Sequence, residues 1–201
     1  MIKINENELY FAKVRPTAII PTKEKENAGY DIYVCFDEDY IVIPPHTTKL
    51  IPTGVASAIS DKYYLGVADR GSTGKIGIKY SAGIIDSGYR GEIFIGITNT
   101  NNIPVIISKL EREELEELYG KYNRITDGVI LDDENNDEDI YLEDYHDFYN
   151  KPCIIYPYSK AIAQLIVHEV HNEMIVQEIP YKKLIEIPSK RGIGALGSTE
   201  K

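Results

Sequence analysis

The chain has 201 residues and a net charge of −10, and most of this charge lies in one segment. Between Glu111 and Asp147 there are 15 of the 32 acidic residues and only three basic ones, so this segment carries −12 and the remainder of the chain +2. The length suits one domain with a full core and an added elaboration. A nearly neutral domain without a basic stripe excludes general nucleic-acid binding, and the lack of a long apolar run excludes a membrane-spanning helix.

Cys35 and Cys153 lie far apart in the sequence. Such a pair is typical of reduced, partly buried thiols in an intracellular protein rather than of a disulfide framework. There is no signal peptide at the start, so we expect a cytoplasmic protein. The high content of Tyr, Ile and Asn is typical of proteins encoded by AT-rich genomes. It is compatible with a virus-encoded protein that acts in the host cell.

Short segments of alternating and β-branched residues predict strands along most of the chain. In chain order they are residues 9–15, 30–34, 41–43, 49–56, 63–68, 161–170, 174–179 and 183–187. Turn-forming residues such as Pro44 and Pro45 separate them. Many short strands with little helical periodicity predict an all-β fold, a jelly-roll-like β-barrel.

Two polar features interrupt this strand pattern. Asp31 stands inside a predicted strand, where an unpaired carboxylate is costly, so it either accepts hydrogen bonds from nearby backbone or faces a site. Residues 69–77, DRGSTGKIG, predict a glycine-rich loop with many donors. Its backbone N–H groups and Arg70 suit phosphate oxygens, although the residue order is not that of a P-loop.

The segment 79–94 contains the most unusual combination of side chains. Two apolar runs flank DSGYRG, and this pattern predicts a β-hairpin. A stable turn needs Ser-Gly, but it does not need Asp86, Tyr89 and Arg90 at one tip. From these residues alone, a solvated turn with an incidental charge pair remains an alternative to a site.

Residues 101–157 differ in character from the rest of the chain. Apolar residues at helical spacing predict one amphipathic helix over residues 115–122. The run DDENNDED at 132–139 is expected to be solvated, because the glycine and the final glutamate of a calcium loop are missing. We interpret 101–157 as a partly helical acidic insertion in a β domain formed by residues 1–100 and 158–201.

Five segments in a fixed order resemble the five motifs of the trimeric dUTP diphosphatase (dUTPase) family. They are AGYDIYV at 28–34, DRGSTGK at 69–75, GIIDSGYRGEI at 83–93, IAQLI at 162–166 and RGIGALGST at 191–199. The third is a close match, and the second and fifth are divergent. The resemblance covers roughly residues 1–100 and 158–201 and leaves the acidic segment outside.

This resemblance implies a jelly-roll subunit, a homotrimer with three shared active sites, and hydrolysis of dUTP to dUMP and diphosphate with Mg²⁺. Asp86 would be the general base that activates the water attacking the α-phosphorus. Tyr89 would pack under the deoxyribose and exclude a 2′-hydroxyl. Asp31 would hold Mg²⁺ through water. No ligand role carries over to Arg90, which we expect to hold the turn.

The remaining substrate contacts follow from the same resemblance. Uracil would pair with the backbone of the hairpin and lie between two aromatic rings, which would involve Gly83, Ile84, Ile85, Tyr80 and Phe94. The phosphates would be held by Arg70, Gly71 and Ser72 of a neighbouring subunit, joined by Gln164. The glycine-rich arm of a third chain would close over the substrate with Arg191, Leu196, Gly197, Ser198 and Thr199.

The sequence departs from the family pattern in three motifs. Gly71 stands where the second motif usually has Ser, and Asp69 occupies a usual proline position. Leu196 replaces the aromatic residue that stacks on uracil. Residues 159–161, Ser-Lys-Ala, replace the Gly-Asp-Arg turn that opens the fourth motif. These differences bear on the rate of the reaction rather than on the fold.

Two alternatives come from other functional classes. The first is a dUTPase-fold nucleotide sensor with weak catalysis, whose insertion contacts a protein partner; Gly71 and Leu196 favour it, and the intact Asp86 and Tyr89 oppose it. The second is a related dCTP deaminase. It is disfavoured because Glu92 is the only nearby candidate for its catalytic glutamate, and dUTPases carry Glu there too.

Overall fold

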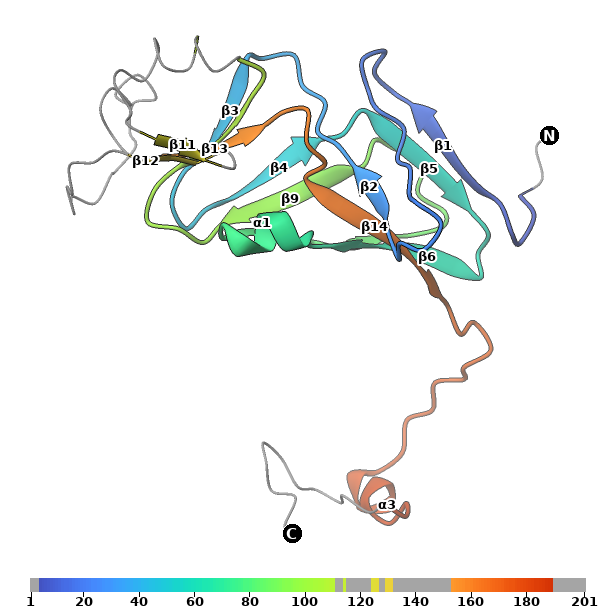
Figure 1. Cartoon of the computed structure of the whole chain (residues 1–201). Helices are drawn as coiled ribbons and strands as arrows, with labels where there is room; N and C mark the ends of the chain where they lie inside the picture. Colours follow the sequence, from blue (N-terminus) through green and yellow to red (C-terminus); the bar gives the residue numbers. More distant parts are fainter. Residues whose placement is uncertain (1–3, 111–113, 115–123, 127–128, 132–152, 190–201) are drawn as a thin grey trace. The chain divides into compact units, whose positions relative to one another are not determined.

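A computed structural model describes residues 4–110, 114, 124–126, 129–131 and 153–189 of the chain (Figure 1). The chain divides into two units, residues 1–170 and residues 171–201, and each is described by itself. No helix among the described residues is both long and apolar enough to cross a membrane.

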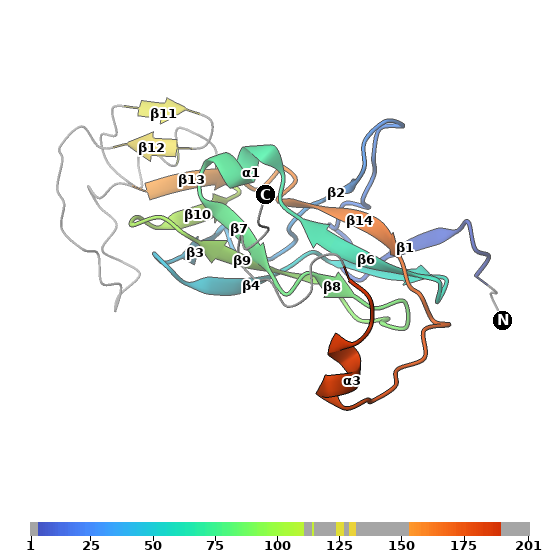
Figure 2. The same ribbon diagram turned by 90° about the horizontal axis from the view of Figure 1, so that it is seen from below.

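The regular elements of the first unit are mainly strands, and these belong to four sheets (Figures 1 and 2). One sheet pairs β1 (Leu9–Lys13) with β5 (Val55–Ile59). A second has the order β11 (Arg124–Thr126), β12 (Val129–Leu131), β13 (Cys153–Pro157), β10 (Val105–Ser108) and β3 (Tyr40–Ile43). A third has the order β2 (Tyr30–Ile32), β14 (Ala163–Glu169), β6 (Tyr63–Ala68) and β8 (Ile84–Ile85). The fourth has the order β4 (Thr48–Pro52), β9 (Phe94–Asn99) and β7 (Ile78–Ser81). The predicted all-β fold is confirmed.

The core of the first unit consists mainly of β-branched side chains. The large side chains that are essentially inaccessible to solvent are Ile32, Ile43, Ile51, Leu65, Ile78, Ile93, Ile95, Ile97, Ile106 and Ile107. Isoleucine has one strongly preferred χ1 rotamer and packs well on a pleated surface, which explains why an isoleucine-rich sequence forms this core.

The predicted hairpin at residues 79–94 was wrong in its pairing. Its first apolar run forms β8, which pairs with β6, and its second forms β9, which pairs with β4 and β7. The two runs therefore lie in different sheets. Ala82 has a φ of 57°, a left-handed conformation that turns the chain out of β7 before β8 begins. The turn with Asp86 thus connects two sheets.

Two other predicted segments differ from the structure. The loop at 69–77 contains a short helix, α1 (Gly71–Lys75). The buried Thr73 explains it, because the Thr73 hydroxyl accepts a hydrogen bond from the N–H of Arg70 and donates to its carbonyl. The predicted strand at 49–56 is divided between β4 and β5 at Gly54, whose φ of 67° suits glycine.

Both ends of the predicted insertion contribute strands to the second sheet. β10 and β13 pair in parallel in the middle of that sheet, and Val105 and Cys153 are fully buried. We therefore propose that the insertion itself is the shorter run between these two strands. Two predicted features lie outside the described residues: the helix at 115–122 and the acidic run at 132–139.

The second unit contains no strand among its described residues, so the strands predicted at 174–179 and 183–187 were wrong. Residues 174–179 have no regular structure and residues 181–185 form helix α3 (Tyr181–Ile185). Pro180 stands at the N-cap of α3, and its carbonyl accepts from the N–H of Leu184. Val176 is 95% exposed. The alternation of apolar residues indicated a strand, but in this unit it corresponds to no buried face.

Candidate active site

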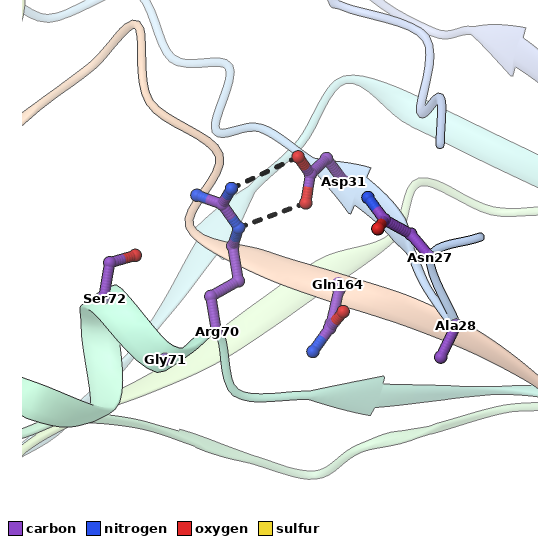
Figure 3. Close-up of a pocket in the computed structure, with 7 residues that line it drawn as sticks. All are labelled: Asn27, Ala28, Asp31, Arg70, Gly71, Ser72 and Gln164. Carbon is purple, nitrogen blue, oxygen red and sulfur yellow. Dashed lines mark hydrogen bonds and ion pairs between the residues drawn. The ribbon is translucent and has the colours of Figure 1, made fainter. Parts of the chain in front are cut away.

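Seven residues from three distant segments line one cavity of about 310 Å³ (Figure 3). They are Asn27, Ala28, Asp31, Arg70, Gly71, Ser72 and Gln164. Five of these seven were predicted from the sequence, one as a metal-binding residue and four as phosphate-binding residues. Neither Asn27 nor Ala28 was predicted.

Strand register brings these segments together. β14 lies between β2 and β6, and Gln164 is paired with Asp31 on one side and with Ala68 on the other. Directly paired residues of antiparallel strands project to the same face of a sheet. Arg70 comes two residues after the end of β6 and caps the N-terminus of α1. It therefore lies beside the side chains of Asp31 and Gln164.

Arg70 makes an ion pair with Asp31 that uses both carboxylate oxygens. Its Nε lies 3.1 Å from Oδ1 and its Nη2 lies 3.2 Å from Oδ2 (Figure 3). Its Nη1 donates to the carbonyl of Ala161 at 2.9 Å. Two parallel hydrogen bonds fix the plane of the guanidinium, so Arg70 has a defined orientation at the cavity.

Gln164 is held by the backbone and lies between Arg70 and Ala28 in the view of Figure 3. Its Nε2 donates to the carbonyl of Asp69 at 2.8 Å. A Cβ on Gly29 would lie 2.7 Å from Gln164 Oε1, so only glycine leaves room for this amide. The glycine of the AGYD segment is thus explained by the close approach of Gln164.

Asp69 connects this cavity to β7. Its Oδ1 accepts from the backbone N–H of Tyr80 at 3.1 Å, and its Oδ2 lies 3.4 Å from Nζ of Lys79. The negative charge expected beside the phosphate loop is therefore paired. Because the Asp69 carbonyl also binds Gln164, one residue joins β14, β7 and the start of α1.

The residues predicted to bind the nucleoside form a second group, which does not line this cavity in the described part of the chain. The side chains of Ile84, Tyr89 and Phe94 are 70%, 46% and 43% exposed, and Asp86 is also exposed. The Tyr80 ring packs over Gly83, where a Cβ would lie 2.6 Å from Tyr80 Cε2. Ile85 is buried.

The turn between β8 and β9 is fixed by its own side chains. Tyr89 donates its hydroxyl to the carbonyl of Glu92 at 2.9 Å, and the N–H of Tyr89 donates to the carbonyl of Asp86 at 3.0 Å. Arg90 donates to the carbonyls of Ser87 and Tyr89. The prediction that Arg90 holds the turn is confirmed.

Glu92 has a structural environment. Its Oε1 accepts from Nε of Arg15 at 3.1 Å and from the N–H of Gly54 at 2.8 Å, and its side chain is only 13% exposed. A carboxylate engaged in this way anchors the segment after the turn to β1 and β5. This environment removes the only candidate for the glutamate of a deaminase.

Both cysteines are free and buried, as predicted. Burial raises the pKa of the Cys153 thiol to about 12, so it is a neutral packing residue and not a nucleophile. The arm residues Arg191, Leu196, Gly197, Ser198 and Thr199 lie outside the described residues.

The donors at the cavity suit a hydrated Mg²⁺ better than a metal bound directly by protein. Within the described ranges, no three His, Cys, Asp or Glu side chains converge as a metal cage. Each carboxylate oxygen of Asp31 accepts one bond from Arg70 and retains a lone pair that could accept from a metal-bound water. Mg²⁺ retains several waters and takes other ligands from substrate phosphates, so this set fits it.

Comparison with known proteins supports the resemblance of the sequence to the dUTPase family. The family model described as dUTPase matches residues 15–112. A deoxyuridine 5′-triphosphate nucleotidohydrolase of Leptospira interrogans is 36% identical over 64 residues, which is 31% of this chain and 43% of that protein. The chain thus matches less than half the length of this relative.

Solved structures show the same fold over most of the chain. A mutant dUTPase of Staphylococcus bacteriophage 80alpha with dUpNHpp has a TM-score of 0.62 at 24% identity, covering 96% of this chain and 98% of that one. The dUTPase from phage phi11 of S. aureus, solved to visualise a species-specific insert, has a TM-score of 0.56 at 22% identity and covers 86% and 96%. With the family-model match and the shared fold, the five ordered segments identify this chain as a member of the dUTPase family.

Proposed function

We propose that the chain hydrolyses dUTP to dUMP and diphosphate with Mg²⁺, and that it does so as a homotrimer. The observation that carries the proposal is the cavity that unites Asp31, Arg70, Ser72 and Gln164 from three separate segments. A guanidinium, a hydroxyl and amide groups are donors that suit phosphate oxygens. A carboxylate beside them suits a hydrated metal ion.

The nucleobase would bind at β8. This strand is the last in its sheet, so its outer row of N–H and C=O groups is available among the described strands. Backbone donors and acceptors in a fixed geometry can pair with uracil, and a base with the wrong groups would leave them unpaired. Tyr89 is held by its bond to the Glu92 carbonyl, and its exposed ring would pack against the deoxyribose.

Asp86 would act as the general base. Its carboxylate would take a proton from the attacking water as the oxygen bonds to the α-phosphorus and diphosphate leaves. Arg70 and Ser72 would hold the phosphates in line, and Gln164 would complete this contact. Asp31 would hold Mg²⁺ through water, and the bound ion would supply positive charge that offsets the charge of the phosphates.

The division of the predicted residues into two groups supports the trimer. Asp86 and Tyr89 are exposed, and neither is among the residues that line the cavity. A homotrimer with shared sites would combine the turn of one subunit with the cavity of another. The acidic segment is proposed to lie outside this catalytic assembly, where it is free to contact a protein partner.

Diphosphate release from dUTP, dTTP, dCTP and UTP, with and without Mg²⁺, tests the proposal. Asp86→Asn removes the base with little change in shape, and Asp39→Asn is the matched control on an exposed loop. We expect turnover only with dUTP, a loss of at least a hundredfold in Asp86→Asn, which is the scale of general-base catalysis, and no loss in Asp39→Asn. Tight binding of dUTP without hydrolysis by the wild type would contradict the enzyme and favour the nucleotide sensor.

A further inference from the structure

Tyr156 is a buried polar side chain directly behind the candidate phosphate site. It lies in β13 and is 2% exposed. Its hydroxyl donates to the carbonyl of Ala161 at 2.6 Å. Tyr156 does not line the cavity, so it has no direct access to a ligand there.

The same carbonyl also binds Arg70. Nη1 of Arg70 donates to Ala161 at 2.9 Å, so the phenol and the guanidinium converge on one oxygen. A carbonyl oxygen has two lone pairs and can accept both bonds. Ala161 itself is 3% exposed, and this carbonyl is therefore a fixed point in the wall behind the cavity.

The Tyr156 phenol stays protonated beside this guanidinium. Burial raises the pKa of Tyr156, and the opposing effect of the positive charge of Arg70 is smaller. The net shift is upward, so the phenol remains neutral and keeps its proton for the Ala161 carbonyl at neutral pH. The phenol and the guanidinium are thus coupled through one carbonyl oxygen.

This arrangement belongs to the divergent part of the chain. Residue 161 is alanine where the fourth motif of the family usually carries arginine, so it supplies no side-chain donor. Among the described residues, the hydroxyl of Tyr156 donates to the backbone carbonyl of Ala161. The local sequence YPYSKA does not indicate this role, because it depends on Arg70, which is 91 residues away from Ala161 in the sequence.

We propose that Tyr156 is a positioning residue for the phosphate site. Its hydroxyl fixes the Ala161 carbonyl, and this carbonyl holds Arg70 in the orientation that receives the diphosphate part of the substrate. The identity of that ligand rests on the proposed function. A tyrosine that only fills the core would contribute to stability alone, whereas a positioning tyrosine would change the affinity for phosphates selectively.

The test compares Tyr156→Phe with Tyr158→Phe. The first removes only the hydroxyl at Ala161, and the second removes a hydroxyl two residues away whose neighbours are Cys35 and Phe36. Binding of inorganic diphosphate with Mg²⁺ and binding of deoxyuridine are measured by calorimetry for each protein. We expect Tyr156→Phe to weaken diphosphate binding about tenfold, the upper range of one net hydrogen bond between neutral groups, and to leave deoxyuridine binding within twofold. Tyr158→Phe should change neither.

A double-mutant cycle separates positioning from general stability. If Tyr156 acts through Arg70, the loss in diphosphate affinity in Tyr156→Phe/Arg70→Lys will be smaller than the combined losses of the single variants. Additive losses, or equal weakening of diphosphate and deoxyuridine, would overturn the proposal. Tyr156→Met, which keeps apolar volume without a hydroxyl, replaces the phenylalanine variant if that protein does not fold.

The two proposals fail in different ways. If the wild type binds diphosphate but does not hydrolyse dUTP, the proposed function is overturned. The role of Tyr156 is then still decided by the diphosphate affinities of Tyr156→Phe and Tyr158→Phe. A wild type that binds neither dUTP nor diphosphate overturns both. In an active enzyme, Tyr156→Phe should raise KM for dUTP about tenfold with a smaller change in kcat.

Discussion

Arg70 binds both carboxylate oxygens of Asp31, at 3.1 and 3.2 Å, and thereby links the second predicted motif to the first. Both side chains are about one-third exposed, so the pair contributes at most about 1 kcal/mol to the free energy of unfolding. Its importance is therefore expected in ligand binding. A phosphate group would compete with Asp31 for Arg70, and this exchange would leave Asp31 free to bind a hydrated metal ion.

Asp31→Asn should raise the Mg²⁺ concentration needed for half-maximal dUTP hydrolysis. The amide is neutral and attracts metal-bound water less strongly, so we expect an increase of about tenfold, equivalent to about 1.4 kcal/mol. The melting temperature should change by only a few degrees. Glu6→Gln, which breaks the exposed ion pair with Lys62, is the control and should change neither quantity appreciably. An unchanged Mg²⁺ requirement in Asp31→Asn would exclude Asp31 from the metal site.

Asp69 should couple the phosphate site to the nucleoside site. Asp69→Asn keeps the oxygen that accepts from the Tyr80 N–H, whereas Asp69→Ala removes it. We expect the alanine variant to raise KM for dUTP by about five- to tenfold, the scale of one net hydrogen bond, and the asparagine variant to stay within threefold. Steady-state kinetics measure both values. Lys79→Met isolates the ion pair, and a loss as large as that of Asp69→Ala would assign the effect to charge instead.

The site could be predicted from the sequence where a residue's role depends on its own motif. Asp31, Arg70, Ser72 and Gln164 were identified because their order along the chain matches a known pattern, and the structure brings them to one cavity. Asn27, next to the first motif, was missed because loop residues at a cavity carry no pattern of their own. The roles of Asp69 and Tyr156 were missed because they depend on contacts between residues distant in sequence, Asp69 with Gln164 and Ala161 with Arg70.

The fold could be predicted as far as local periodicity determines it. Alternating residues located β2, β6 and β14, but periodicity gives no pairing, so β8 and β9 were assigned to one hairpin although they lie in separate sheets. Apolar residues after position 170 resembled strands because periodicity does not report burial. There the helix α3 follows a proline, and its residues are exposed.

Mixed oligomers test whether the site is shared between subunits. Arg70→Ala and Asp86→Asn proteins should each be inactive alone, because each lacks one group of the site. If Arg70 and Asp86 of one site come from different chains, random mixing restores about a quarter of the sites in a closed symmetric oligomer. The measurement is dUTP hydrolysis after the two variants are denatured and refolded together. No recovery in verified mixed trimers would indicate that both residues come from one chain.

Removal of the acidic segment takes away β11 and β12 and leaves β13 at the edge of its sheet. The other strands of the β domain should stay paired, provided that the new connection is long enough. β10 and β13 run parallel, so the chain must return along the length of the strands, which takes about a dozen residues. Replacing residues 111–150 with a Gly/Ser linker of about that length should preserve trimer mass and dUTP turnover within threefold, since linkers of this composition impose no fixed structure. Light scattering and kinetics check these outcomes. Insoluble chains would show that the segment is needed for folding.

The atom that water attacks is the most direct test of the proposed hydrolysis of dUTP to dUMP and diphosphate. Hydrolysis of dUTP by the wild-type protein in H₂¹⁸O, followed by ³¹P NMR or mass spectrometry of the products, identifies that atom. Attack on the α-phosphorus with departure of diphosphate predicts one ¹⁸O in dUMP and none in diphosphate. Label in the diphosphate, or release of monophosphate and dUDP, would contradict the proposed reaction.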